Sequence, residues 1–247
     1  MSKHKKKNDN DIAYGIHAVE SLLNHSPEKV LQIWLQKNRD DKRINTIIEL
    51  ANKSGVSVEH ISTDKLNKKY EDVRHQGVVA RIRPANNSLQ IEDILALDKC
   101  LLLVLDGIED PHNIGACLRT ADAVGVDAVV VSKNRSPGIT PVVRKVASGA
   151  ADTVPFIAVS NLARTLQQLK DNDVWVIGAA GETETSIFDC KPSNKMALVM
   201  GAEEKGLRRL TKESCDELVK IPMSGSVESL NVSVAIGICL YALQRKQ

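Results

Sequence analysis

Six short apolar runs, separated by helix-like segments, constrain the fold of this chain more than any other feature. The run CLLLVLDG at residues 100–107 is apolar throughout and ends in Asp-Gly, which is typical of a parallel strand covered on both faces. Further runs begin at residues 128, 153, 174, 196 and 217. Helices are expected between them at 113–125, 141–150, 160–170 and 207–213, with a last helix at 229–245. The alternation predicts an open α/β sheet with helices on both faces.

A shorter α/β pattern precedes this sheet. It includes a helix-like YGIHAVESLLN, a strand-like VLQIWLQ at 30–36 and a closing HQGVVARIR. The polar, proline-containing stretch at 85–96 is interpreted as a linker. We therefore predict a disordered basic arm at 1–11, a small α/β domain at 12–84 and a larger α/β domain at 97–247.

Composition narrows the class of protein. Of the 247 residues, 43% are hydrophobic and 26% charged, and no apolar run approaches the roughly 20 residues that span a bilayer. The basic N-terminus has no apolar segment behind it, which argues against a secretory signal. The five cysteines are scattered and form no C-x-x-C pair, so a disulfide framework or a zinc site is not expected. The pattern favours a cytoplasmic protein without a metal, in which Cys117 and Cys239 are core residues.

Charge is unevenly distributed. Residues 1–84 hold 16 Lys+Arg and 11 Asp+Glu, a net charge of +5, whereas the remainder holds 17 and 20, a net charge of −3. A basic first third suggests a module that docks on a polyanion. The alternative is that the lysine run at 3–7 is a solubilising tail that supplies most of the excess.

The first polar segment after a strand is LDGIEDPHNIGACLRTADAVG, residues 105–125. Asn113 is placed to cap a helix that begins at Ile114, and Gly125 is placed to close it. Arg119 lies next to the apolar face of this helix. On its own it is better explained as a solvated surface arginine.

The second segment is LVMGAEEKGLRRLT, residues 198–211. Gly201 and Gly206 would let the backbone approach a ligand closely. No Lys-Ser/Thr follows the second glycine, and no G-x-G-x-x-G follows a first strand. A Walker loop and a Rossmann dinucleotide site are therefore not supported.

The third segment is IPMSGSVESLNVSVAIG, residues 221–237. It leads into a helix that is apolar almost all round, which predicts that the sheet covers one side and a second subunit the other. Ser229 and Asn231 are expected in the first turn of this helix. A cap explains Ser229, whereas Asn231 inside the turn needs another partner.

These three segments, in this order, resemble the motifs of the SPOUT superfamily of RNA methyltransferases, in its SpoU/TrmH branch of 2′-O-ribose enzymes. The matching stretches are DPHNIGACLRTADA, LVMGAEEKGL and IPMSGSVESLNVSVA, and YGIHAVESLL and HQGVVARIRP match the small domain. The resemblance spans residues 12–246 and is nearest to bacterial enzymes that act on large-subunit rRNA.

The resemblance implies a methyltransferase domain with a trefoil knot, S-adenosylmethionine as cofactor, and a homodimer formed through the C-terminal domain. It implies methylation of a guanosine ribose in large-subunit rRNA. Alternatives are the same chemistry on transfer RNA, resistance methylation of a different rRNA loop, or a non-catalytic RNA-binding or assembly factor.

The resemblance also assigns residues to roles. The catalytic positions are Asn113, Arg119, Glu203, Ser229 and Asn231. The cofactor positions are Gly178, Ala179, Gly181, Met200, Gly201, Ile221, Met223 and Leu230. The candidate RNA contacts of the small domain are Tyr14, His17, His75, Gln76, Arg81 and Arg83, although His17 is equally well explained as a helix-packing residue. One departure is Glu204, which stands where relatives usually have glycine and places the role of Glu203 in doubt.

Overall fold

The computed structural model of the chain describes residues 12–39, 41–70, 75–83, 89–191, 193–203 and 205–245. Contacts divide the chain into two compact units. Unit 1 comprises the chain up to residue 86 together with 139–153, and unit 2 comprises 87–138 together with 154–247. The predicted arm at 1–11, part of the predicted linker and Glu204 lie outside the described residues.

Unit 1 is built on a four-stranded mixed sheet in the order β1-β4-β2-β3. The strands are β1 (Ile12–Tyr14), β2 (Val30–Gln36), β3 (Val58–Ile61) and β4 (Val78–Ile82). Only the β2–β3 pair is parallel. Helices α1 (Ile16–His25) and α2 (Lys42–Lys53) pack their apolar residues against one face of the sheet. The short turn η2 (Pro27–Lys29) follows α1. Helix α3 (Thr63–Lys69) supplies Leu66 to a smaller cluster on the other face.

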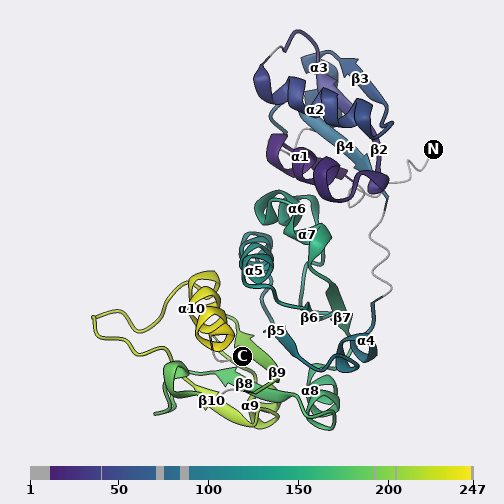
Figure 1. Cartoon of the computed structure of the whole chain (residues 1–247). Coiled ribbons are helices and arrows are strands. Elements are labelled where there is room, and N and C mark those ends of the chain that lie inside the picture. Colours follow the sequence, from purple (N-terminus) through teal and green to yellow (C-terminus); the bar gives the residue numbers. More distant parts are fainter. Residues whose placement is uncertain are drawn as a thin grey trace, which may run out of the picture. The chain divides into compact units, whose positions relative to one another are not determined.

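Two further helices, α6 (Pro141–Ala147) and α7 (Ala150–Thr153), also belong to unit 1 (Figure 1). One helix was predicted over 141–150, but the chain breaks it at Ser148 and Gly149, whose φ angles are 52° and 106°. Arg144 Nη1 donates to Asp152 Oδ1 at 2.6 Å, and both side chains are almost fully buried. These residues fall inside the segment predicted as the larger domain, yet their contacts are with unit 1.

Unit 2 contains a six-stranded sheet in the order β10-β8-β9-β5-β6-β7, in which every pairing is parallel. Its strands are β5 (Cys100–Asp106), β6 (Ala128–Ser132), β7 (Phe156–Val159), β8 (Trp175–Ala179), β9 (Lys195–Gly201) and β10 (Glu217–Val219). All seven residues of β5 are buried, as expected of a strand covered on both faces. The predicted α/β class with its six strands is confirmed.

Helices cover both faces of this sheet (Figure 1). On one face, α4 (Ile91–Leu95) and α8 (Leu162–Lys170) share an apolar cluster with alternate residues of the strands, and α9 (Arg209–Glu213) lies beside α8. On the other, α10 (Val232–Gln244) packs against α5 (Pro111–Val124) and β9. A turn, η3 (Ile187–Asp189), contacts α10.

Helix α4 lies inside the stretch that was interpreted as a linker, so that interpretation is wrong for residues 91–95. None of the helices in the described ranges is long and apolar enough to cross a membrane. The trefoil knot stays a prediction.

Candidate functional site

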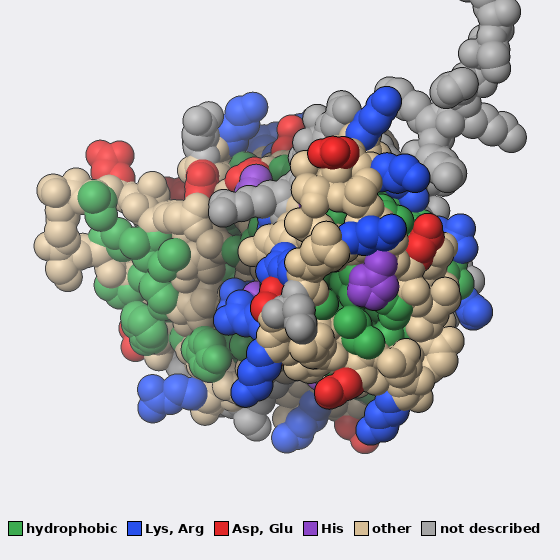
Figure 2. All heavy atoms as spheres, turned by 90° about the horizontal axis from the view of Figure 1, so that it is seen from above, with side chains coloured by type: hydrophobic (Ala, Val, Ile, Leu, Met, Phe, Trp, Pro, Cys, Tyr) green, Lys and Arg blue, Asp and Glu red, His purple; other side chains and the backbone are tan. Residues whose placement is uncertain are grey.

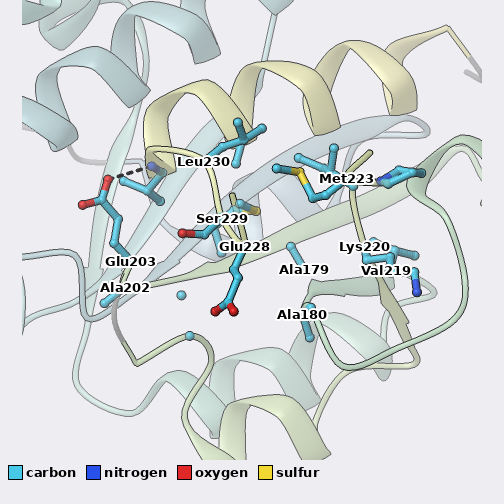
Figure 3. A pocket seen from close by; sticks show the side chains of 18 residues that line it. Ala179, Ala180, Ala202, Glu203, Val219, Lys220, Met223, Glu228, Ser229 and Leu230 are labelled. Carbon is cyan, nitrogen blue, oxygen red and sulfur yellow. Dashed lines mark hydrogen bonds between the residues drawn. The ribbon is translucent and has the colours of Figure 1, made fainter. Parts of the chain in front are cut away.

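A cavity of about 580 Å³ opens where three neighbouring strands of unit 2 end (Figure 3). Ala179 ends β8, Gly201 ends β9 and Val219 ends β10, and the chain between β10 and α10 closes the cavity from the other side. The carboxyl ends of strands are where parallel sheets usually hold their ligands. The cavity is lined by Ala179, Ala180, Gly181, Met200, Gly201, Ala202, Glu203, Gly206, Val219, Lys220, Ile221, Pro222, Met223, Glu228, Ser229, Leu230, Val232 and Ala235.

Seven of the eight positions predicted to bind a cofactor line this cavity, and Gly178 alone does not. A Cβ on Gly178 would come within 2.7 Å of the Cys215 sulfur, so this glycine lets the neighbouring elements pack closely. Sequence reasoning missed the lining residues Val219, Pro222, Val232 and Ala235, which carry no polar signal, and also the charged Lys220 and Glu228.

The loop after β9 forms a tight wall of the cavity. Ala202 and Gly206 form an isolated bridge, with Gly206 N donating to Ala202 O at 2.8 Å. A Cβ on Gly201 would lie 2.1 Å from the carbonyl carbon of Gly206, and Gly206 itself has φ 58°. Both glycines are therefore required by the backbone, as the close-approach interpretation of this segment predicted.

An ion pair anchors the far end of this loop. Arg208 N donates to Asp106 Oδ2 at 3.1 Å, and Arg208 Nε donates to Asp106 Oδ1 at 2.5 Å. The Asp106 side chain is fully buried at the end of β5, whereas that of Arg208 is 39% exposed. A buried carboxylate needs such partners, so the pair fixes the far end of the loop against the end of β5.

Three of the predicted catalytic residues meet through hydrogen bonds. Asn231 Nδ2 donates to Glu203 Oε1 at 2.5 Å and to Asn113 Oδ1 at 3.2 Å. Glu203 Oε1 also accepts from Val232 N at 2.9 Å, which places its negative charge at the N-terminus of α10. The loop after β9 and the first turns of α5 and α10 are thereby joined.

The helix caps differ from those predicted. Asp110, not Asn113, caps α5: its side chain accepts from His112 N, and Asn113 lies in the first turn. Asn231 caps α10 through Ser233 N, so Ser229 precedes the helix instead of capping it. The prediction that Gly125 closes α5 is confirmed by its left-handed conformation. With α5 beginning before Asn113 and α10 beginning after Asn231, the side-chain amides of these two residues form a hydrogen bond with each other.

Ser229 and Arg119 occupy different places. Ser229 lines the cavity, next to Glu228 and Leu230. Arg119 is exposed on α5 and lines neither this cavity nor the smaller one described below. It makes no hydrogen bond or ion pair within the part of the chain that the structure describes. The structure therefore does not bring Arg119 into contact with Ser229 or Asn231.

A second cavity of about 300 Å³ adjoins the first and shares Ala202, Glu203, Gly206 and Val232 with it. It lies between the ends of β5 and β9 and the start of α5. Its polar lining consists of Asp106, Glu109, Asp110, Asn113, Glu203, Arg135, Lys205 and Arg208. Glu203 therefore lies between a largely apolar cavity and a charged one, and Asn113 lines the charged one.

The six candidate RNA contacts of unit 1 divide by exposure. His17, Gln76, Arg81 and Arg83 are exposed, whereas Tyr14 and His75 are buried. Burial raises the pKa of Tyr14 and, together with the charge of Lys145, lowers the pKa of His75. His75 accepts from Gly77 N through Nδ1 and pairs with Asn67 Oδ1 through Nε2, which fits a neutral ring.

The cysteines are consistent with packing roles. Cys117 and Cys239 are fully buried, and burial raises the pKa of each to about 12, which disfavours a thiolate nucleophile. Their prediction as core residues is confirmed. Among the described residues no group of three or more His, Cys, Asp or Glu is arranged to hold a metal ion.

Comparison with known proteins identifies the class. Residues 100–241 match the SpoU rRNA Methylase family, and residues 12–88 match the RNA 2′-O ribose methyltransferase substrate-binding family. The chain belongs to the SpoU rRNA methylase family.

Relatives match over nearly the whole chain. The 23S rRNA (guanosine-2′-O-)-methyltransferase RlmB of Shewanella oneidensis is 50% identical over 240 residues, which is 96% of this chain and 98% of the relative. RlmB of Escherichia coli K12 is 47% identical over 240 residues, covering 96% and 99%. The resemblance inferred from the three motifs is confirmed.

Solved structures share the fold. A crystal structure of an RNA 2′-O ribose methyltransferase superposes with a TM-score of 0.81 at 24% identity, covering 95% of this chain and 88% of the other. The SpoU methyltransferase AviRb of Streptomyces viridochromogenes, in complex with the cofactor AdoMet, superposes with a TM-score of 0.77 at 22% identity, covering 95% and 89%.

We expect Arg208→Met to lower the free energy of unfolding of unit 2 by roughly 3 kcal/mol, because it leaves the buried Asp106 carboxylate without its counter-charge. The matched control is Arg209→Met, which breaks an exposed i,i+4 pair with Glu213 and should cost less than about 0.5 kcal/mol. The unfolding of unit 2 is measured by urea denaturation, followed by the fluorescence of Trp175. All variants carry Trp34→Phe, which removes the tryptophan of unit 1. Equal small losses in both variants would contradict the anchoring role.

Proposed function

We propose that this protein transfers the methyl group of S-adenosylmethionine to the ribose 2′-hydroxyl of a guanosine in 23S rRNA. The observation that carries the proposal is the roughly half identity, over nearly full length, to enzymes named for this reaction. Both the catalytic and the substrate-binding families are matched, which is the arrangement that an RNA-modifying enzyme needs. The proposed location is the cytoplasm, where this RNA is found.

The residues of the larger cavity fit the cofactor. Its volume lies in the range of small-molecule sites, and Met200, Ile221, Met223 and Leu230 offer an apolar surface for an adenosyl group. Gly201 and Gly206 leave backbone groups of the loop accessible at its rim. When bound, the cofactor supplies a methyl group on a positively charged sulfur. We assign the cofactor role to the seven lining positions, and Gly178 supports them by close packing. The trefoil knot is proposed from the family resemblance alone.

The hydrogen-bonded group of Asn113, Glu203 and Asn231 is proposed to hold the target ribose. Glu203 lines both cavities, Asn113 lines the smaller one and Asn231 hydrogen-bonds to both side chains, so a nucleotide in the smaller cavity would present its sugar to the larger one. Ser229 Oγ is available there as a hydrogen-bond partner for the 2′-hydroxyl. Fixing the hydroxyl at the methyl donor is the main contribution that such residues make, because orientation replaces a costly bimolecular encounter.

Arg119 is proposed to bind an RNA phosphate and to stabilise negative charge as the hydroxyl loses its proton. A guanidinium group stays protonated throughout the physiological pH range, so it is a poor general base. Arg119 follows Asn113 by six residues on α5, which is about 9 Å along the helix axis. That separation suits contact with the backbone of a nucleotide held at Asn113.

We expect Arg119→Ala to lower methyl transfer at least about 100-fold while leaving cofactor affinity unchanged, because Arg119 does not line the cofactor cavity. The measurement is transfer of labelled methyl to unmodified 23S rRNA, with the modified nucleotide mapped, beside cofactor binding by calorimetry. Arg164→Ala, an exposed arginine of α8, is the control.

A single 2′-O-methylguanosine made by the wild type and lost in Arg119→Ala supports the proposal. Labelling of transfer RNA alone would support the proposed methyl transfer but contradict 23S rRNA as the substrate. Cofactor binding without labelling of either RNA would point to an assembly factor.

Unit 1 is proposed to dock on RNA through the sheet face that carries Arg81 and Arg83. Because side chains alternate along a strand, these arginines lie on the face of Trp34 and Val79, opposite α1 and α2. Lys69 lies 3.6 Å from the centre of the Trp34 ring on that face. Figure 2 shows many Lys and Arg side chains among the residues in view.

Replacing Arg81 and Arg83 by alanine should weaken RNA binding and reduce the slope of log affinity against log salt by about 1 to 2, since each lost phosphate contact removes a counterion-release term. Arg43→Ala on α2, which covers the other face, is the control. Fluorescence titrations over a range of salt concentrations measure both variants. An unchanged slope in the double variant would exclude this face as the docking surface.

A second copy of the chain is proposed to cover α10. Val234, Ile238 and Tyr241 form a stripe at helical spacing, and Val234 and Tyr241 are about half exposed in the single chain. Met223 and Val227, in the loop before α10, are exposed as well. In Figure 2 hydrophobic side chains gather at the left margin, where Figure 1 places this loop. Such an apolar surface is typical of an interface.

Sedimentation should find a dimer for the wild type and a monomer for the double variant Val234→Lys, Tyr241→Lys, because charges at the centre of an apolar interface oppose association. Leu210→Lys, an exposed leucine of α9, should leave the dimer intact. A monomeric wild type would contradict the proposed interface.

A further inference from the structure

The larger cavity contains charged side chains to which the proposed function assigns no role. Three charged side chains line it, those of Glu203, Lys220 and Glu228. Glu203 accepts from Asn231 and from Val232 N, and Lys220 Nζ donates to Glu184 Oε2 at 3.1 Å. Glu228 makes no hydrogen bond or ion pair with any residue in the described ranges. Its carboxylate is therefore available to a ligand.

The Glu228 carboxylate points into the cavity. Figure 3 shows it directed into the space between Ala202 and Ala180, whereas the hydroxyl of the adjacent Ser229 is turned toward the side of Glu203. Two consecutive residues thus present different chemistry to different parts of one site.

The cavity around this carboxylate favours a positively charged ligand. The positive charge of Lys220 is matched by Glu184, so Glu203 and Glu228 leave the lining negative. Much of the remaining lining is apolar, and Glu228 itself is exposed, so its attraction for a ligand depends on the salt concentration. A cation placed there gains attraction that an anion or a neutral ligand does not.

We propose that Glu228 binds the ammonium group of the amino-acid portion of S-adenosylmethionine. The inference rests on the proposed function, since it takes that molecule as the occupant of the cavity. The cofactor carries two positive groups, the ammonium and the sulfonium. The reacting sulfonium belongs where the target hydroxyl is proposed to be held, on the side of Glu203 to which Ser229 turns its hydroxyl, whereas the Glu228 carboxylate lies between Ala202 and Ala180. The ammonium is therefore its partner, and the contact is a charge-assisted hydrogen bond.

Calorimetric titration of Glu228→Gln tests the assignment, because glutamine keeps the shape of the side chain and removes its charge. Three ligands are compared: S-adenosylmethionine, S-adenosylhomocysteine, which keeps the ammonium but lacks the sulfonium charge, and methylthioadenosine, which lacks the whole amino-acid portion. We expect the first two to bind about tenfold more weakly and methylthioadenosine to bind as it does to the wild type. Added salt should weaken S-adenosylmethionine binding more in the wild type than in the variant.

The control is Glu182→Gln, which removes a carboxylate near the cavity that pairs with Lys212 and does not line it. It should bind all three ligands as the wild type does. Loss of S-adenosylmethionine binding alone in Glu228→Gln would place Glu228 on the sulfonium and overturn the ammonium assignment. Weaker binding of methylthioadenosine as well would show a structural effect, and unchanged binding of all three would exclude the contact. Failure of the wild type to bind S-adenosylmethionine would instead overturn the proposed function.

Discussion

The site depends on the parallel pairing of β5 with β9. Seven residues of each strand are in register, from Cys100 opposite Lys195 to Asp106 opposite Gly201. Both strands are buried, so a slip of one residue would turn every side chain to the wrong face. The register puts the carboxylate that anchors the following loop beside the glycine at which that loop begins. The hydrogen bonds between β5 and β9 therefore set both the place where the loop begins and the place of the Asp106 carboxylate that anchors it.

The two units separate opposite electrostatic tasks. The cavity of unit 2 presents carboxylates, which suit the net positive charge of the cofactor proposed to bind there, whereas unit 1 exposes arginines suited to a polyanion. A single surface could not serve both, because groups that attract phosphates would repel a sulfonium. The mixed lining of the smaller cavity, with Arg135 and Lys205 beside Glu109, lies next to the junction at which the RNA and the methyl donor are proposed to meet.

Long, uniform apolar runs made the larger sheet predictable: the strand predicted from residue 128 begins there, because a doubly covered strand admits few polar residues. Helix ends were less predictable, since Asp110 and Asn113 are equally good capping residues by type. The five-residue α4 and three-residue β1 were missed because they are too short to show a period. Pairings between distant segments, such as Asp106 with Arg208, carry no local signal at all. Glu228 was overlooked for a different reason, since only its direction in the fold distinguishes it from a solvated glutamate.

The helices α6 and α7 give the chain an unusual connectivity. The polypeptide leaves unit 1, builds the first two strands of the larger sheet, returns to unit 1 for residues 139–153 and leaves it again. Three covalent connections, not one linker, therefore join the units. A fragment cut at the end of β4 would lack Arg144 and Lys145, and unit 2 without residues 139–153 would have to bridge β6 to β7 anew. Unit 1 is thus not a contiguous domain that could be transferred as one segment. Its fold includes residues 139–153, which lie between two strands of unit 2 in the sequence.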